Sequence, residues 1–310
     1  MQNLKMPEGY TISRPEYYKP LPDVGLALER IGLDPNGDYS PSKENLQKLI
    51  LAHMMTVPYE TLDNCDFIRQ VDYFPECLFE RFVLNRRGGY CFEVNGFFMA
   101  ILEGLGYDCY AVAGRLLFGR KVYSGMGHRN TIVNIDGRRY LTDLSFGNGI
   151  CPEGPVDIDE PGIQDVNGEQ FSIRHHNGDT FGDITLVKHN ADGSETDCYC
   201  TYLYPQTLVE FINTNERVQL NFVNRRVCRL KTETGSLIVD GTTYKKTING
   251  EVFEEEIKSF PQFYKILTED FNMIVPRLSL SSSWPKEIAY EREEFRNANP
   301  SWPGNVYKSK

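Results

Sequence analysis

The chain has 310 residues, of which 40% are hydrophobic and 25% charged, and its formal net charge is −10. A chain of this length can bury a large core but exceeds the common single-domain size, so we expect two or three subdomains. The acidic balance argues against general nucleic-acid binding, for which a basic face would be expected.

The sequence carries no sign of membrane insertion or secretion. No apolar run approaches the roughly 20 residues that span a bilayer, and the start of the chain lacks the apolar core of a signal peptide. The eight cysteines are dispersed, which favours reduced thiols over a disulfide framework. We therefore expect a cytoplasmic protein with no nucleic-acid partner and no membrane partner. The oligomeric state stays open.

The first third of the chain is expected to be helical. Ser40 and Pro41 predict a helix that is capped by the serine and has proline at its first position, and an apolar face then continues to Pro58. A second, short helix is expected over residues 78–83, before a double glycine.

A cysteine follows at the point where this glycine loop becomes a helix. Residues 86–95 read RRGGYCFEVN, and apolar residues continue at helical spacing from Val94 until Gly106. The positive end of a helix dipole favours the thiolate, which is the nucleophilic form of cysteine. Cysteine is also one of the most often buried residues, so the position alone does not decide between a nucleophile and a structural thiol.

From about residue 107 the pattern changes to β-strands. The predicted strand runs are 109–118, 129–144, 184–189, 198–203, 227–231 and 237–245. Residues 152–183 are rich in Gly, Pro and Asp and are predicted to form a long loop with little regular structure. A further helix is expected over 261–271. The last 25 residues are expected to form a tail that is either loose or ordered on contact.

One predicted hairpin places a histidine beside an aspartate. Asp136 and Gly137 separate two β-rich runs and predict a two-residue type I′ turn. In that register position 130 lies opposite Asp143, so His128 and Asp143 share a face as diagonal neighbours, roughly 7–8 Å apart between backbones. A slip of one residue would put them on opposite faces. The hairpin thus predicts a base and its orienting acid for a cysteine nucleophile.

Residues 87–95 closely resemble the nucleophile motif of the arylamine N-acetyltransferases. Three further segments resemble that family: 57–62 (VPYETL), 123–128 (YSGMGH) and 140–147 (YLTDLSFG). The separations of 37 residues from the cysteine to the histidine and 15 more to the aspartate fit the family's order. The resemblance covers about residues 20–275.

The resemblance implies an α+β fold of three domains, related to papain-like and transglutaminase enzymes. The implied parts are a helical bundle over 1–106, a β-barrel over 107–205, and an α/β lid with a C-terminal tail over 206–310. It also implies acetyl-CoA, or another acyl-CoA, as co-substrate with no tightly bound cofactor. The implied acceptor is a small aromatic amine, an arylhydroxylamine or a hydrazine.

The resemblance further implies the residues of the site. Cys91, His128 and Asp143 would form the catalytic triad. Ser124 and Gly125 would contact the phosphate or pantetheine of the coenzyme. The expected acceptor contacts are Gly127, Phe92 and Phe146, and the expected structural supports of the loop are Arg87, Glu93 and Asn95.

The segment 211–222 departs from the family pattern. It is shortened and lacks the usual Ser-Pro character, in a region that in the family helps to hold the coenzyme. The coenzyme would then be held by other contacts, for which Arg217, Arg225 and Arg226 are candidates because guanidinium groups bind phosphate in bidentate fashion.

Other functions remain open at this point. A cysteine hydrolase could use the same triad, a related amide synthase could close a macrolactam from a carrier-bound polyketide, and a non-enzymatic protein could share the scaffold. No metal site is expected. Cys198 and Cys200 lie near three histidines in sequence, but a zinc site needs about four convergent ligands with wider cysteine spacing.

Overall fold

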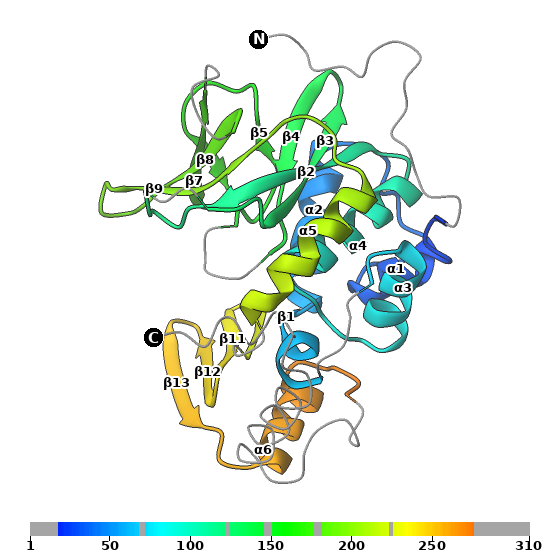
Figure 1. Cartoon of the computed structure of the whole chain (residues 1–310), viewed down its shortest axis with the longest axis vertical. Coiled ribbons are helices and arrows are strands. Elements are labelled where there is room, and N and C mark those ends of the chain that lie inside the picture. Colours follow the sequence, from blue (N-terminus) through cyan, green and yellow to red (C-terminus); the bar gives the residue numbers. More distant parts are fainter. Residues whose placement is uncertain are drawn as a thin grey trace.

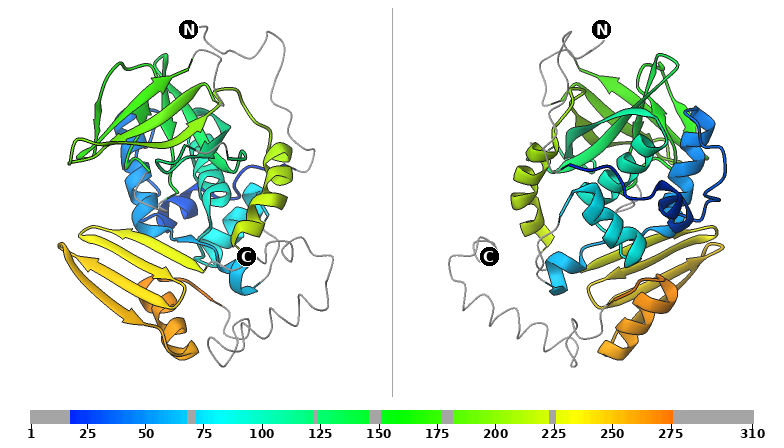
Figure 2. Two further views of the ribbon diagram at one scale, coloured as in Figure 1. Left: turned by 60° about the vertical axis from the view of Figure 1, so that its left-hand side comes forward. Right: turned by 90° about the vertical axis from the view of Figure 1, so that its right-hand side faces the viewer.

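The computed structural model describes residues 18–67, 72–121, 124–145, 151–176, 182–222 and 226–275. It contains a group of helices, an eight-stranded sheet and a five-stranded sheet. Figures 1 and 2 show the eight-stranded sheet at one end of the molecule and the five-stranded sheet at the other, with the helices of the first third between them.

The helical group is confirmed where the sequence predicts it. Its α-helices are α1 (Val24–Arg30), α2 (Lys43–Thr56), α3 (Pro75–Phe79) and α4 (Cys91–Gly104), and π-helical turns cover Asp63–Phe67 and Glu80–Leu84. Helix α4 is the central element because nearly all its residues are buried. Just past its end, Gly106 adopts a φ of 83°, a left-handed conformation that suits glycine.

The predicted start of α2 is wrong by two residues. Ser42 caps the helix, because its hydroxyl accepts a hydrogen bond from the Asn45 amide at 3.1 Å. Ser40 is not the cap: its backbone amide donates to the Asp38 carboxylate, and its carbonyl oxygen accepts a hydrogen bond from the Asn45 side chain. Proline therefore precedes the cap and does not occupy the first helical position.

The larger sheet is antiparallel and curls into a nearly closed barrel. Its strands lie in the order β5-β4-β3-β2-β9-β8-β7-β6. A ring nitrogen of His175 on β7 lies 2.9 Å from the carbonyl oxygen of Ile158, just after β5, and so links the two ends of the sheet. The strands are β2 (Asp108–Leu116), β3 (His128–Ile135), β4 (Arg138–Thr142), β5 (Val156–Asp157), β6 (Gln164–Val166), β7 (Glu169–His175), β8 (Ile184–His189) and β9 (Glu195–Thr201).

The β3–β4 hairpin has the predicted register. Ile135 pairs with Arg138, and Asp136 and Gly137 between them both have positive φ, 50° and 78°. These are the angles that a type I′ turn needs, and aspartate and glycine tolerate them. The turn therefore fixes the register of the two strands, and with it the side chains that share a face near the start of β3.

The prediction of a long loop over 152–183 is wrong. Strands β5, β6 and β7 lie there, and β6 and β7 form a second hairpin in which Val166 pairs with Glu169. Asn167 and Gly168 make its turn, with φ of 53° and 85°. The Asn-Gly pair is itself a strong hairpin signal, but the flanking strands are short and polar, so their composition resembles that of a loop.

The smaller sheet combines one segment from the first third of the chain with four strands from its last third. Its order is β1-β10-β11-β12-β13, and β1 (Tyr59–Glu60) pairs with β10 (Val227–Thr232). The single predicted run over 237–245 is two strands, β11 (Gly235–Asp240) and β12 (Thr243–Ile248), because the chain turns at Gly241. The division into three domains stays a prediction.

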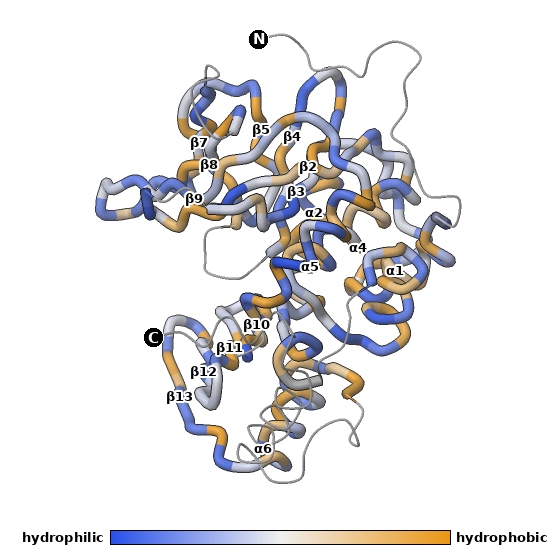
Figure 3. Tube along the Cα trace, in the orientation of Figure 1, coloured by the Kyte–Doolittle hydropathy of each residue, from blue (hydrophilic) through white to orange (hydrophobic). Residues whose placement is uncertain are grey.

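Strand β13 (Glu251–Glu256) was not predicted, and it is one of the two edge strands of this sheet. Figure 3 shows a hydrophobic stretch within its otherwise hydrophilic trace. Helix α6 (Phe260–Lys265) and the π-helical turn Ile266–Asp270 confirm the predicted helix over 261–271. Both pack against the sheet. Helix α5 (Leu208–Val218) and the 3₁₀ turn Gln219–Phe222 connect the two sheets (Figure 1).

Candidate active site

Cys91 is the first residue of α4 and lies below a tightly packed loop. A Cβ at Gly88 would lie 2.0 Å from the carbonyl oxygen of Pro58, so only glycine fits there. Glu60 and Gly89 join their backbones by a 2.9 Å hydrogen bond. The loop is thus fixed against the chain around β1, and it places Cys91, only 4% exposed, at the start of the helix.

His128 and Asp143 meet as the hairpin register predicts. His128 Nε2 lies 2.7 Å from Asp143 Oδ2, and both side chains are buried. The Cys91 sulfur lies 3.9 Å from the carbonyl oxygen of Gly127, the residue before His128. The end of the hairpin therefore faces the first turn of α4.

The charges of this pair are strongly coupled. Burial by itself would lower the pKa of His128, but the Asp143 carboxylate and the Cys91 sulfur outweigh it and raise the pKa to about 10. Burial would raise the pKa of Asp143, but His128 and the hydrogen bonds it accepts lower it to about 2. At neutral pH the pair is an imidazolium and a carboxylate. Nδ1 of His128 has no nitrogen or oxygen partner among the described residues, which leaves this atom for the cysteine.

Asn95, one helical turn after Cys91, holds the aspartate. Its amide nitrogen donates to Asp143 Oδ1 at 3.0 Å, and its carbonyl oxygen accepts from the Leu144 amide at 3.0 Å. The same nitrogen lies 2.6 Å from the carbonyl oxygen of Arg129. Sequence reasoning treated Asn95 only as a support of the loop. The four-residue spacing from Cys91, which places both on one helix face, was the available signal.

Cys151 is a second thiol at the site that the sequence did not indicate. Its sulfur lies 3.4 Å from Asp143 Oδ2 and 2.8 Å from the carbonyl oxygen of Ser145. The residue precedes β5 in the segment predicted to be a loop. No residue pattern around it points to the aspartate, so only the folded structure identifies this contact.

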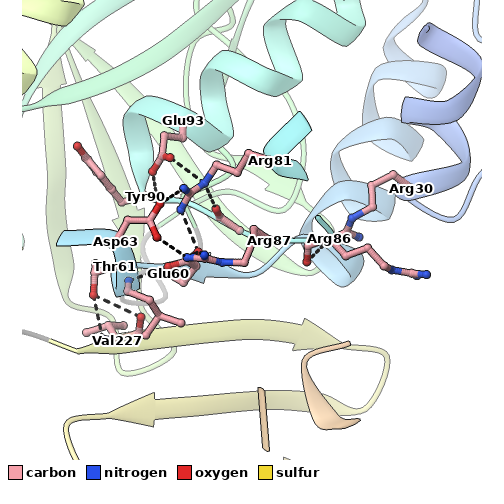
Figure 4. Close-up of polar contacts among 12 residues, drawn as sticks. Arg30, Glu60, Thr61, Asp63, Arg81, Arg86, Arg87, Tyr90, Glu93 and Val227 are labelled. Atoms are coloured by element: carbon pink, nitrogen blue, oxygen red, sulfur yellow. Dashed lines mark hydrogen bonds and ion pairs between the residues drawn. The ribbon is translucent and has the colours of Figure 1, made fainter. Parts of the chain in front are cut away.

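A buried ion cluster supports the loop before Cys91 (Figure 4). Arg87 lies 2.6 Å from Glu60 and 2.9 Å from Asp63, and Arg81 contacts both acids and lies 2.9 Å from Glu93. Burial raises the pKa of Glu93 to about 8, against the opposing effect of Arg81. Glu93 also accepts a hydrogen bond from the Tyr90 amide at 3.1 Å. The positions of Arg87 and Glu93 thus agree with the expected support of the loop. Arg81 is a further residue of this ion cluster, which the sequence analysis did not identify.

Two connected cavities lead to the sulfur. The inner one, of about 110 Å³, is lined by Cys91, His128 and Asp143 together with apolar side chains. The outer one, of about 800 Å³, shares several of these apolar residues. None of the described residues that line it is Asp or Glu, and four are arginines: Arg115, Arg120, Arg217 and Arg229.

The remaining expected site residues are placed in different ways. Ser124 and Gly125 line the outer cavity, and Gly127 lines both cavities. Phe92, expected in an acceptor pocket, lies instead in the core with its ring 5.7 Å from that of Phe211, because its position in α4 points it away from both cavities. Phe146 lies outside the described residues.

The arginines suggested for binding the coenzyme lie in different environments. Arg217 lines the outer cavity, whereas Arg226 is buried over the Phe263 ring at 5.1 Å. Arg225 lies outside the described residues. The sequence missed Arg115, Arg120 and Arg229, which come from β2, the loop after it, and β10.

The described part of the chain contains no group of three or more His, Cys, Asp or Glu residues that could hold a metal ion. Within the same residues, no helix has the length and apolar character needed to cross a membrane.

Comparisons with known proteins agree with the geometry. A family model described as N-acetyltransferase matches residues 43–279. The chain is 33% identical over 162 residues to an arylamine N-acetyltransferase of Mycolicibacterium smegmatis, a match that covers 51% of this chain and 58% of that protein. It is 25% identical over 288 residues to arylamine N-acetyltransferase 1 of Oryctolagus cuniculus, covering 84% and 97%. A proansamycin X synthase of Amycolatopsis mediterranei is 30% identical over 154 residues, covering 49% and 58%.

Solved structures share the fold. The arylamine N-acetyltransferase of Salmonella typhimurium superposes with a TM-score of 0.75 at 19% identity, covering 88% of this chain and 98% of that one. The Mycobacterium marinum enzyme in complex with CoA gives a TM-score of 0.71 at 21% identity, covering 83% and 96%. With most of its length matched by the family model and the fold shared throughout, the chain belongs to the arylamine N-acetyltransferase family.

Proposed function

We propose that the protein transfers an acetyl or related short acyl group from acyl-CoA to an arylamine, an arylhydroxylamine or a hydrazine, through an acyl group carried on Cys91. The observation that carries the proposal is the meeting of three side chains, Cys91, His128 and Asp143, at the inner end of an arginine-lined cavity.

In the first half-reaction Cys91 acts as the nucleophile. Asp143 holds the imidazole of His128 through Nε2, so Nδ1 takes the thiol proton and a thiolate–imidazolium pair results. The thiolate attacks the thioester carbonyl carbon, and backbone N–H groups in the first turn of α4 stabilise the developing oxyanion. His128 then gives its Nδ1 proton to the CoA sulfur as the thioester bond breaks, so CoA leaves as a thiol, the acyl group remains on Cys91 and the imidazole is neutral again.

In the second half-reaction the amine attacks the acyl carbon. His128 takes the proton that the nitrogen loses, and the Cys91 thiolate leaves. CoA must depart before the amine reaches the acyl group, because donor and acceptor approach the same inner cavity of about 110 Å³. This order is the double displacement of a ping-pong enzyme.

The outer cavity supports a free coenzyme as donor. Four arginines without an acidic residue among its described lining suit a ligand with several phosphate charges. CoA carries a pyrophosphate and a further phosphate, whereas a carrier-bound phosphopantetheine carries one phosphodiester. The charge of the cavity therefore favours acyl-CoA over the carrier-bound substrate that an amide synthase would use. A family member of the same fold has been solved with CoA.

Intact-protein mass spectrometry tests the proposal. The protein is mixed with acetyl-CoA alone, and one acetyl adduct that maps to Cys91 is expected. Cys91→Ala should give no adduct, whereas Cys200→Ala, at a buried thiol on β9, should behave as wild type. An adduct at another residue, or steady CoA release without any amine, would reject the transferase and favour a hydrolase.

A further inference from the structure

Helix α5 packs against the start of α4 through one narrow buried stripe. The buried residues of α5 are Phe211, Asn215 and Val218, and their spacing of four and three positions puts them on one face of the helix. The Phe211 ring lies 5.7 Å from that of Phe92 and nearly perpendicular to it, and Phe211 and Val218 share an apolar cluster with Cys91. Asn215 is the polar member of this stripe.

Tyr90, the residue before Cys91, is the partner of Asn215. Its hydroxyl donates to Asn215 Oδ1, and the Tyr73 hydroxyl oxygen lies 2.8 Å from that of Tyr90. Burial raises the pKa of both tyrosines well above the usual value, so both hydroxyls keep their protons. Because Tyr90 gives its single proton to the asparagine, Tyr73 must donate to Tyr90. None of these three residues is more than 3% exposed, so water does not compete for the bonds.

The same helix forms a wall of the outer cavity through Asn213, Thr214 and Arg217. Arg217 lies two positions after Asn215, roughly 200° further around the helix axis, and so it faces away from the buried stripe. Apolar contacts have no direction and allow a helix to rotate or slide, whereas a buried hydrogen bond has a defined geometry and is costly to leave unmade. The bond at Asn215 therefore restricts the rotation of α5, and with it the direction of Arg217.

We propose that Tyr90 and Asn215 are positioning residues, which fix α5 against the loop before Cys91 and thereby direct Arg217 toward the phosphates of the coenzyme. Their hydrogen bond joins the residue next to Cys91 to the helix that carries Arg217. It helps to set the separation of sulfur and guanidinium group, which must match the length of the coenzyme between its thioester and its phosphates. The inference rests on the proposed function, because it concerns how the donor is held.

Two variants and three reactions test this role. Tyr90→Phe removes only the hydroxyl oxygen, and Asn215→Leu keeps the size of the side chain. Each should raise the Michaelis constant for acetyl-CoA by up to about tenfold, the effect of losing one charge-assisted contact. Deacylation of preformed acetyl-Cys91 by an arylamine and alkylation of Cys91 by iodoacetamide should keep their wild-type rates. If the bond merely supported the loop, its loss would slow these two reactions as well. The control Tyr107→Phe removes a buried hydroxyl that binds the Ser40 carbonyl oxygen at 3.3 Å, away from both cavities, and should change none of the three.

A combination with Arg217→Ala tests whether the bond acts through this arginine. Asn215→Leu added to Arg217→Ala should raise the Michaelis constant no further than Arg217→Ala alone, because the guanidinium group that it displaces is already gone. Tyr90→Phe, which adds no atom, replaces Asn215→Leu in the combination if the latter does not fold. The inference is overturned by effects that multiply, by an unchanged Michaelis constant in the folded single variants, or by an equal loss in all three reactions. Failure of wild-type Cys91 to accept an acetyl group would instead reject the proposed function, so the two failures are distinguishable.

Discussion

Asn95 and Asp143 connect helix α4 to the hairpin through a hydrogen bond of 3.0 Å. Because Asn95 lies one turn after Cys91 on α4, this contact sets the distance between the sulfur and the imidazole that Asp143 holds. The Asn95 amide therefore helps to fix the relative placement of helix and hairpin.

Replacing this amide should impair both activity and stability. Asn95→Ala leaves the Leu144 amide without its acceptor and leaves Asp143 Oδ1 with the Ser145 amide alone, which should lower the free energy of unfolding by about 1–3 kcal/mol. The acylation rate should fall by up to about a hundredfold as the imidazole loses its orientation. Stopped-flow CoA release and urea unfolding measure the two effects. Asn134→Ala, which removes an exposed Asn–Asp contact on β3, is the matched control and should change neither.

The charge of Asp143 should matter more than its shape. Asp143→Asn is isosteric, so the melting temperature should change little, but acyl-enzyme formation should fall by about two to four orders of magnitude. Asp157→Asn provides a control at another buried carboxylate, which pairs with Arg138 on β4. Equal acylation rates in wild type and Asp143→Asn would contradict the proposed role of His128 as the base.

The stability of the protein should fall with rising pH above neutrality. The pKa of His128 is raised to about 10 in the folded protein, so the native state binds a proton that the unfolded chain releases above about pH 6.5. The stabilisation is complete below about pH 6.5 and is lost as the pH approaches 10. The slope from this group is at most about 1.4 kcal/mol per pH unit.

Urea unfolding between pH 6 and 10 measures this slope. His128→Gln should show a flatter profile than wild type across that window, because glutamine does not titrate. A matched change at the end of β8, His189→Gln, should leave the profile as in wild type. Parallel profiles for wild type and His128→Gln would show that no raised pKa exists at this site.

Two arginines that are close in sequence should have different roles. Arg217 is exposed and lines the outer cavity, so Arg217→Ala should raise the Michaelis constant for acetyl-CoA about tenfold. Deacylation of preformed acetyl-Cys91 should not change, since the coenzyme has already left. Arg226 is buried over Phe263, so Arg226→Ala should lower the melting temperature with little effect on the Michaelis constant. The opposite pattern would place the coenzyme elsewhere.

The sequence predicts those parts of the site that local chemistry determines. Asp136 and Gly137 fix a turn, and from the turn the register and the His128–Asp143 contact follow. The start of α4 at Cys91 follows in the same way from a glycine loop and an apolar face. The Asn167–Gly168 pair could also have predicted the second hairpin from its turn chemistry. It was not predicted because the flanking strands are short and polar.

Other parts depend on tertiary packing that no local pattern records. The arginines of the outer cavity come from separate elements, and their common orientation arises only when the barrel, α5 and the smaller sheet assemble. Cys151 reaches Asp143 from a segment with no periodic signal. Phe92 belongs to the core because of its angle around α4, which depends on where the other helices lie.

Strand β1 also limits how the cleft can move. It pairs with β10, and Thr61 binds the backbone of Val227 on that strand (Figure 4). The five-stranded sheet is thus anchored to the segment that packs against the loop before Cys91. Tyr59 of the same strand lines both cavities. A movement of β10 away from β1 would break these hydrogen bonds. The width of the cleft on this side therefore depends on the pairing of β1 with β10.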